Sequence, residues 1–321
     1  MSLPGSPRLP YDRLPPALRA AIDSALGSPV VAASARTGGF SPGPAAVLTC
    51  ADGSRAFVKA VGTPLNPDTP DLLRREARIT ATLPAGLPVP RLRAHLEVAD
   101  GDDEWVALLF DVVDGANPEL PWTAATATRV LAGVSAFGAA TTPCPVPGLP
   151  PLAERVTTEL TAWPLLHAAP PADLDPWEAE RLDSLAALPE RLAARGALTG
   201  DALVHLDLRA DNLLLTPAGE VVLLDWAWAA VGPAWVDPLL LVLDMAVHGG
   251  LDPAALLAGV PAAAAAAPAD VTDLLLVLTG MWAATMRRPA RPGLPTLRAF
   301  QRRFHDVALA WVVQRTAAGL G

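Results

Sequence analysis

The residues of this 321-residue chain that are best suited to chemistry lie close together between positions 203 and 226. His205, Asp207 and Asn212 form the pattern His-x-Asp-x-x-x-x-Asn, and Asp225 follows the next run of apolar residues. This order of polar residues is typical of a phosphoryl-transfer catalytic loop and its metal-binding aspartate. Because apolar segments flank them, we expect these side chains to be presented together. The alternative is that they are ordinary turn residues, since Asp and Asn are favoured in turns.

Phosphoryl transfer mainly requires the alignment of a hydroxyl with the γ-phosphate and the neutralisation of charge. We therefore predict that Asp207 orients the acceptor hydroxyl and takes its proton. Magnesium prefers hard oxygen ligands and usually keeps several waters, so the Asp225 carboxylate and the Asn212 amide oxygen would suffice as its protein ligands. His205 is predicted to be a hydrogen-bonded structural residue, neither a base nor a metal ligand.

One cation stands out in the composition. Lys59 is the only lysine among 24 basic residues, so a general need for positive charge does not explain it. It ends the second of two predicted strands, 46–50 and 55–59, which flank an Asp-Gly turn. The segment 71–83 has helical spacing of its apolar residues and contains Glu76. We predict that Lys59 contacts the α- and β-phosphates and that Glu76 holds the lysine by an ion pair.

Both assignments have a simpler structural alternative. Considered alone, Lys59 would be taken for a surface residue of a strand. Glu76 has arginines at positions 74, 75 and 78 as neighbours, so local ion pairs on a solvated helix compete with a partnership with Lys59.

The strands and helices predicted around these residues indicate an α+β fold. The chain is too long for one ordinary domain, so we expect two lobes. We expect an N-terminal nucleotide-binding lobe over 1–114, made of an antiparallel sheet with one key helix. A mainly helical C-terminal lobe over 115–321 would hold the catalytic loop and the acceptor site. Residues 1–14 are rich in proline and are predicted to be a tail. Further predictions are a helix at 15–22 and strands at 91–98, 105–113, 213–215 and 221–224.

Composition and charge exclude several classes of protein. Hydrophobic residues make up 51% of the chain and charged residues 18%, which predicts a folded protein. A net charge of −9 without a basic run argues against nucleic acid as a partner. We also predict no membrane span and no secretory signal, and therefore a cytoplasmic protein. Two cysteines cannot build a disulfide framework or a cysteine-based zinc site.

Together, these features resemble the aminoglycoside phosphotransferase family, small-molecule kinases with the protein-kinase-like fold. The resemblance runs from about Thr37 to Asp244 and is strongest over 203–238. The features that carry it are the glycine-rich loop at 37–43, Lys59, Glu76, the Asp114-Gly115 turn, the pattern from His205 to Asn212, and Asp225-Trp226.

The resemblance has consequences for ligands and for individual residues. It implies ATP and Mg²⁺, with adenine against the hinge backbone near Phe110, Val112 and Val113. It also implies that the loop over 38–41 closes on the phosphates, so that Gly39, Phe40 and Ser41 join the nucleotide site. Asp237 would be a structural residue that braces the catalytic loop.

Two departures from the pattern do not identify a substrate. Leu206 stands where glycine is frequent in aminoglycoside-modifying members, and tryptophans at 226 and 228 replace the Phe-Gly of protein kinases. The interval from Asp225 to Asp237 leaves little room for a long activation segment. A small-molecule hydroxyl acceptor is therefore preferred over a protein acceptor.

The acceptor itself stays open at this point. Most of the excess negative charge lies in the second lobe, which would suit an aminoglycoside or another amine-bearing alcohol, although a solvated acidic surface explains it equally well. A metabolic sugar, choline or homoserine kinase and a catalytically silent nucleotide-binding or regulatory module are the alternatives. Candidate acceptor-binding acids are Asp173, Asp175, Glu178 and Glu180.

Overall fold

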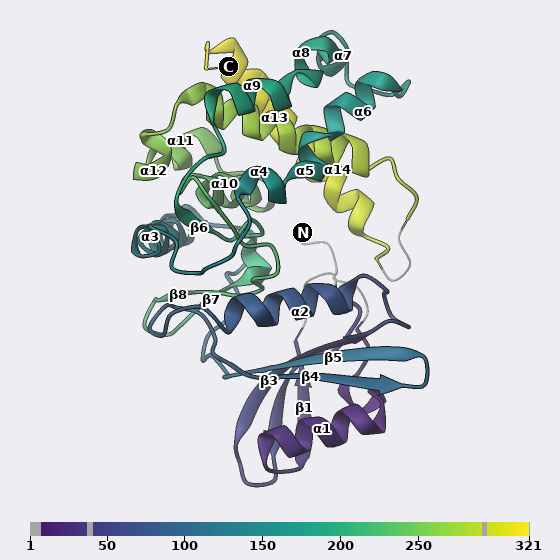
Figure 1. Cartoon of the computed structure of the whole chain (residues 1–321). Coiled ribbons are helices and arrows are strands. Elements are labelled where there is room, and N and C mark those ends of the chain that lie inside the picture. The colour runs from purple at the N-terminus through teal and green to yellow at the C-terminus, as the bar shows by residue number, and fades with distance from the viewer. Residues whose placement is uncertain (1–7, 37–40, 291–293, 321) are drawn as a thin grey trace.

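The computed structural model describes residues 8–36, 41–290 and 294–320, in two parts stacked one on the other (Figure 1). A twisted sheet with two helices forms the N-terminal part, and helices dominate the C-terminal part. This arrangement confirms the predicted α+β class. The chain crosses from one part to the other just after residue 110.

The N-terminal sheet is antiparallel and has the strand order β1-β2-β3-β5-β4. The predicted hairpin forms between β2 and β3, with Gly53 in a left-handed conformation at the turn. Lys59 lies opposite Ala45 on β2 and Leu108 on β5, near the middle of the sheet. The strands are β1 (Val30–Ala35), β2 (Ala45–Cys50), β3 (Arg55–Gly62), β4 (Leu92–Asp100) and β5 (Asp103–Phe110).

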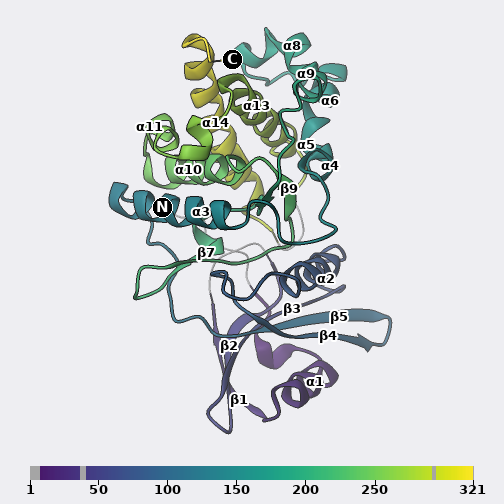
Figure 2. The ribbon, with the colours of Figure 1, turned by 60° about the vertical axis from the view of Figure 1, so that its left-hand side comes forward.

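The two helices of this part cover opposite faces of the sheet. Helix α1 (Pro16–Leu26) lies on the face that points away from the C-terminal part, and α2 (Thr69–Thr80) lies on the other face (Figure 1 and Figure 2). Strand β5 follows this division: Leu109 packs in the cluster under α1, whereas Leu108 packs in the cluster under α2. The period of two along a strand therefore buries β5 on both sides.

The prediction of a tail over residues 1–14 was wrong for its described end. Residues Tyr11–Arg13 form a 3-10 helix, and Leu14 is buried in the cluster under α1. The Leu9 N–H donates to the Pro42 carbonyl at 2.8 Å, and a guanidinium nitrogen of Arg8 donates to the Gly43 carbonyl at 3.0 Å. The segment from Arg8 onward is thus part of the N-terminal lobe.

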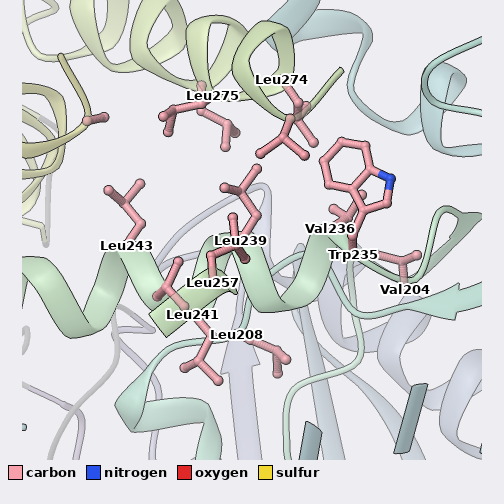
Figure 3. Close-up of a cluster of buried hydrophobic side chains, with 14 of the residues drawn as sticks. Val204, Leu208, Trp235, Val236, Leu239, Leu241, Leu243, Leu257, Leu274 and Leu275 are labelled. Carbon is pink, nitrogen blue, oxygen red and sulfur yellow. The ribbon is translucent and has the colours of Figure 1, made fainter. Parts of the chain in front are cut away.

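Helix α10 (Val236–Gly249) is the centre of the C-terminal part. It is apolar on nearly all sides because α3 (Ala124–Ala140), α14 (Leu297–Ala317) and shorter helices contact it. Leu239 and Leu243 of α10 belong to the same buried cluster as Leu274 and Leu275 of α13 (Pro268–Thr285) (Figure 3). Within the described ranges, no helix is long and apolar enough to cross a membrane.

Shorter helices complete this part of the molecule. They are α4 (Leu152–Arg155), α5 (Thr157–Leu160), α6 (Ala162–Ala168), α7 (Pro176–Ala179), α8 (Leu182–Ala186), α9 (Leu188–Arg195), α11 (Pro253–Ala258) and α12 (Pro261–Ala264).

Two short antiparallel strand pairs fix the segment that contains the predicted catalytic residues. Strand β6 (Ala202–Val204) pairs with β9 (Ala230–Gly232), and β7 (Leu213–Leu215) pairs with β8 (Val221–Leu223). The segment 205–212 connects β6 to β7, and Asp225 comes two residues after β8. Both ends of the catalytic segment are therefore tied to strands.

The role of α10 as a core helix gives a test of the packing. Leu239 is fully buried, so we expect Leu239→Ala to lower the free energy of unfolding by about 2–5 kcal/mol through lost burial and a residual cavity. Leu165 is 62% exposed, so Leu165→Ala should change it by less than about 0.5 kcal/mol. Denaturant titration of both variants measures the difference; equal effects would contradict this packing.

Candidate active site

Asp237, at the start of α10, holds the first residues of the catalytic segment. Its two carboxylate oxygens accept the backbone N–H groups of His205 at 2.7 Å and of Leu206 at 2.9 Å. Burial raises the pKa of Asp237 to about 6, although both backbone donors oppose the shift. These contacts are the brace that was expected of Asp237.

His205 connects this segment to the strand that leads to Asp225. Its side chain is fully buried, and its Nε2 is 2.7 Å from the Leu224 carbonyl oxygen, while Nδ1 accepts the Asp207 N–H at 3.2 Å. This pattern requires the proton on Nε2, and burial lowers the pKa of His205 to about 4. The imidazole is neutral and structural, as predicted.

Asp207 is held by both of its carboxylate oxygens. Oδ1 accepts from the Arg209 guanidinium at 2.7 Å, and Oδ2 accepts from Nδ2 of Asn212 at 3.0 Å. Burial raises the pKa of Asp207 to about 7, against the opposing charge of Arg209. A carboxylate with a pKa near neutrality suits proton transfer at physiological pH.

Left-handed backbone marks two positions of the site. Among the described residues other than glycine, Leu206 (φ 68°) and Asp225 (φ 69°) alone have positive φ. Such a conformation costs a non-glycine residue about 1–3 kcal/mol and persists only where the surroundings enforce it. At Leu206 the Asp237 brace is such a constraint, because the Asp237 carboxylate holds the backbone N–H of Leu206.

Lys59, Glu76 and Asp225 form an ion-pair triad between the two lobes. Nζ of Lys59 lies 2.8 Å from Oε2 and 3.0 Å from Oε1 of Glu76, and 3.2 Å from Oδ1 of Asp225. The Glu76 side chain is 3% exposed, so the alternative of a solvated helix residue is wrong. Burial disfavours the ammonium, but Asp225 and Glu76 outweigh it and raise the pKa of Lys59. The lysine is charged at neutral pH.

The oxygen donors near the triad fit magnesium. Asn212 donates through Nδ2 to the backbone oxygen and to Oδ2 of Asp207, which leaves Oδ1 as the amide oxygen for a metal. The Asp225 side chain is 37% exposed and carries the second hard oxygen. No cluster of three or more His, Cys, Asp or Glu ligands occurs in the described parts of the chain, so phosphates and waters would complete the coordination.

Two cavities meet at these residues. The first, of about 350 Å³, lies between the lobes and has Val47, Phe57 and Leu214 among its apolar walls. The second, of about 500 Å³, lies against the C-terminal helices and is lined by Asp207. Lys59, Glu76, Asn212 and Asp225 line both cavities.

The residues expected to bind nucleotide divide between three places. Phe110, Val112 and Val113 line the first cavity. Ser41 lines the second cavity instead. Gly39 and Phe40 lie outside the described residues.

The hinge and the catalytic segment are joined by a residue that we did not predict. Nδ2 of Asn117 donates to the backbone oxygens of Leu213 at 2.8 Å and Asp211 at 3.2 Å, and Asn117 lines the first cavity. Asparagine occurs only three times in the chain, so its rarity was a usable signal.

Arg209 and Arg8, which line the second cavity, were also missed, because arginine is common in this sequence.

The four acids proposed for acceptor binding do not line either cavity. Glu178 is fully buried and lies 2.9 Å from Nε2 of His305, and Asp175 caps α7. Asp173 pairs with Arg287, and Glu180 pairs with Arg181. That prediction was wrong because a count of charges gives no direction for the side chains.

A match to a protein-family model shows which family the chain belongs to. The model of the phosphotransferase enzyme family APH matches residues 38–274, which is most of the chain. The chain belongs to this family. The match confirms the expectation of a phosphotransferase. A search of curated proteins found no match.

Solved structures show the fold of this phosphotransferase. The choline kinase LicA from Streptococcus pneumoniae has a TM-score of 0.59 at 13% identity, covering 92% of this chain and 98% of that chain. A microcompartment-associated aminopropanol kinase has a TM-score of 0.59 at 18% identity, with 94% and 98% covered. An aminoglycoside phosphotransferase from Alicyclobacillus acidocaldarius has 0.50 at 18% identity, with 92% and 96% covered. These likenesses confirm the two-lobed kinase-like fold.

The Asp237 brace predicts a loss of stability in the phosphotransferase when one oxygen becomes an amide. In Asp237→Asn, an NH₂ group faces one of the two backbone N–H donors, so we expect the free energy of unfolding to fall by about 1–3 kcal/mol. Asp102→Asn, in the exposed turn between β4 and β5, is the control. Denaturant titration tests this; an unchanged Asp237→Asn would refute the brace.

The Asp207–Arg209 pair predicts a pKa shift. Arg209 lowers the pKa of Asp207 from the value that burial alone would give, so Arg209→Met should raise it above about 7 and leave the carboxyl protonated at neutral pH. A ¹³C NMR titration of the aspartate carboxyls, with Asp207→Asn to assign the signal, measures this. Arg195→Met, which affects only the pairs with Asp270 and Asp273, should not shift it. A lower or unchanged pKa of Asp207 in Arg209→Met would contradict this effect of Arg209.

Proposed function

We propose that this phosphotransferase moves the γ-phosphoryl group of ATP, with Mg²⁺, to a hydroxyl of a small molecule. The observation that carries the proposal is the placement of Asp207 in the second cavity, beside residues that line both cavities. A nucleotide in the first cavity and an alcohol in the second would meet at Lys59, Asn212 and Asp225. The catalytic, nucleotide and metal roles predicted for these residues belong to this proposal.

The reaction is a single exchange of bonds. The hydroxyl oxygen of the acceptor forms a bond to the γ-phosphorus, and the bond between the γ-phosphorus and the bridging oxygen breaks, which releases ADP. A carboxylate oxygen of Asp207 orients the hydroxyl and receives its proton. The ammonium of Lys59 neutralises phosphate charge, and Glu76 keeps it in position. Asp225 and Asn212 would hold Mg²⁺, which would supply positive charge to the phosphates when bound.

Two further observations support the nucleotide and the size of the acceptor. The same choline kinase has been solved in complex with AMP, with a TM-score of 0.58 at 13% identity. Here, only β9 and a short turn separate Asp225 from α10, so a long segment that binds a protein substrate has little room. We expect the enzyme to work in the cytoplasm, where ATP is supplied, and to need no nucleic acid or membrane.

The role of Asp207 as base predicts loss of turnover with nucleotide binding retained. We expect Asp207→Asn to lower ADP release, measured with Mg-ATP in the presence and absence of a mixture of small alcohols, by about 100- to 10,000-fold. Binding of a non-hydrolysable ATP analogue should change little, because Asp207 does not line the first cavity. Turnover equal to the wild type would refute the proposal, and Asp102→Asn is the control.

A further inference from the structure

The wall of the second cavity is largely apolar. Side chains from α10, α13 and α14 form much of its lining in the C-terminal part. Most of them are buried, and none of the six named here carries a charge. They are Leu240, Leu243, Leu278, Met281, Trp282 and Phe304.

Charges on the rest of this cavity are balanced. Apart from the N-terminal lobe and the segment 205–225, the described lining residues include two charged ones, Arg155 and Glu159. They are four positions apart, on the short helices α4 and α5, and their charges interact. Among the described residues, the part of the cavity that would hold the body of an acceptor therefore has no net charge.

These two residues also offer unused hydrogen bonds. The Nε of Arg155 and the Oε2 of Glu159 are buried and have no hydrogen-bond partner among the residues that the structure describes. Buried polar atoms are normally paired, so a ligand that supplies an acceptor and a donor along this edge would satisfy both. The rest of a well-matched ligand would be apolar, because the lining side chains from α10, α13 and α14 offer mainly carbon.

From this lining we infer that the acceptor is an uncharged, largely apolar alcohol, whose hydroxyl reaches Asp207 and whose polar edge meets Arg155 and Glu159. The inference rests on the proposed phosphotransfer, since Asp207 defines where the hydroxyl lies. A polycationic acceptor fits poorly, because its ammonium groups would lose water against leucine, tryptophan and phenylalanine. Among the described residues of this wall, Glu159 is the one carboxylate. The cationic acceptor considered from the acidic composition is therefore disfavoured.

The test compares binding of apolar and cationic alcohols by calorimetry, with and without a non-hydrolysable ATP analogue and Mg²⁺. The probes are testosterone and cyclododecanol as uncharged apolar alcohols, and kanamycin as a polycationic one. We expect the apolar probes to bind at least about 10-fold more tightly than kanamycin. Binding of kanamycin alone, or of none of the three, would overturn the inference.

A variant that weakens binding of one probe and strengthens binding of the other distinguishes a change in the cavity wall from misfolding. Met281→Glu adds a carboxylate to the half-buried wall, so it should weaken testosterone binding by about 10-fold and strengthen kanamycin binding. Misfolding would weaken both. Leu165→Glu, on an exposed leucine that does not line the cavity, should change neither. Equal affinity of Met281→Glu and the wild type for both probes would overturn the inference.

The contribution of the buried polar atoms of Arg155 and Glu159 can be tested separately. Testosterone has a carbonyl that cyclododecanol lacks, so Arg155→Met should weaken testosterone binding and leave cyclododecanol binding unchanged; equal loss for both would overturn the role of this edge. Failure of the proposed function looks different. In that case the ATP analogue does not bind, or ADP release is insensitive to Asp207→Asn, whichever alcohol occupies the second cavity.

Discussion

One partly buried ammonium group, with a side chain that is 19% exposed, connects the two lobes. Lys59 on the N-terminal sheet is held by Glu76 on α2 and by Asp225 from the C-terminal lobe. Removing one partner of a buried ion pair costs about 3–5 kcal/mol, because it leaves a charge without compensation. The positions of the N-terminal sheet, α2 and the catalytic segment relative to one another therefore depend on the Lys59 ammonium. The same charge lies where the two cavities meet, so this constraint on the fold also defines the place for phosphate.

The sequence predicted the elements whose side chains alternate or repeat clearly. The β2-β3 hairpin and α2 begin and end near the turn and proline signals that predicted them. Strand β1 was missed because its small residues, Ala32 to Ala35, are exposed and show no alternation. Leu14 was assigned to a tail because it lies between prolines and polar residues, and only the sheet formed by distant segments explains its burial.

In the candidate active site, rare residue types and motif spacing predicted more of the observed contacts than the count of acidic residues did. The only lysine, and an asparagine five residues after Asp207, led to contacts that the structure contains. Asn117 carried the same signal of rarity but had no motif around it, and its partners are distant in sequence. The direction of Arg155 and Glu159 depends on how α4 and α5 pack, which no local pattern encodes. Counting acids pointed to residues that do not line the cavities.

The role of Asp225 as a ligand of the Mg²⁺ that accompanies the nucleotide can be tested directly. The measurement is a calorimetric titration with a non-hydrolysable ATP analogue, with and without Mg²⁺, for the wild type and Asp225→Asn. Asparagine tolerates the left-handed backbone at this position, so the change removes the charge and keeps the conformation. We expect Mg²⁺ to strengthen binding of the analogue to the wild type by at least about 10-fold and to have little effect on binding to the variant. Binding that does not depend on Mg²⁺, or an equal Mg²⁺ effect in both proteins, would contradict the role of Asp225 as a metal ligand.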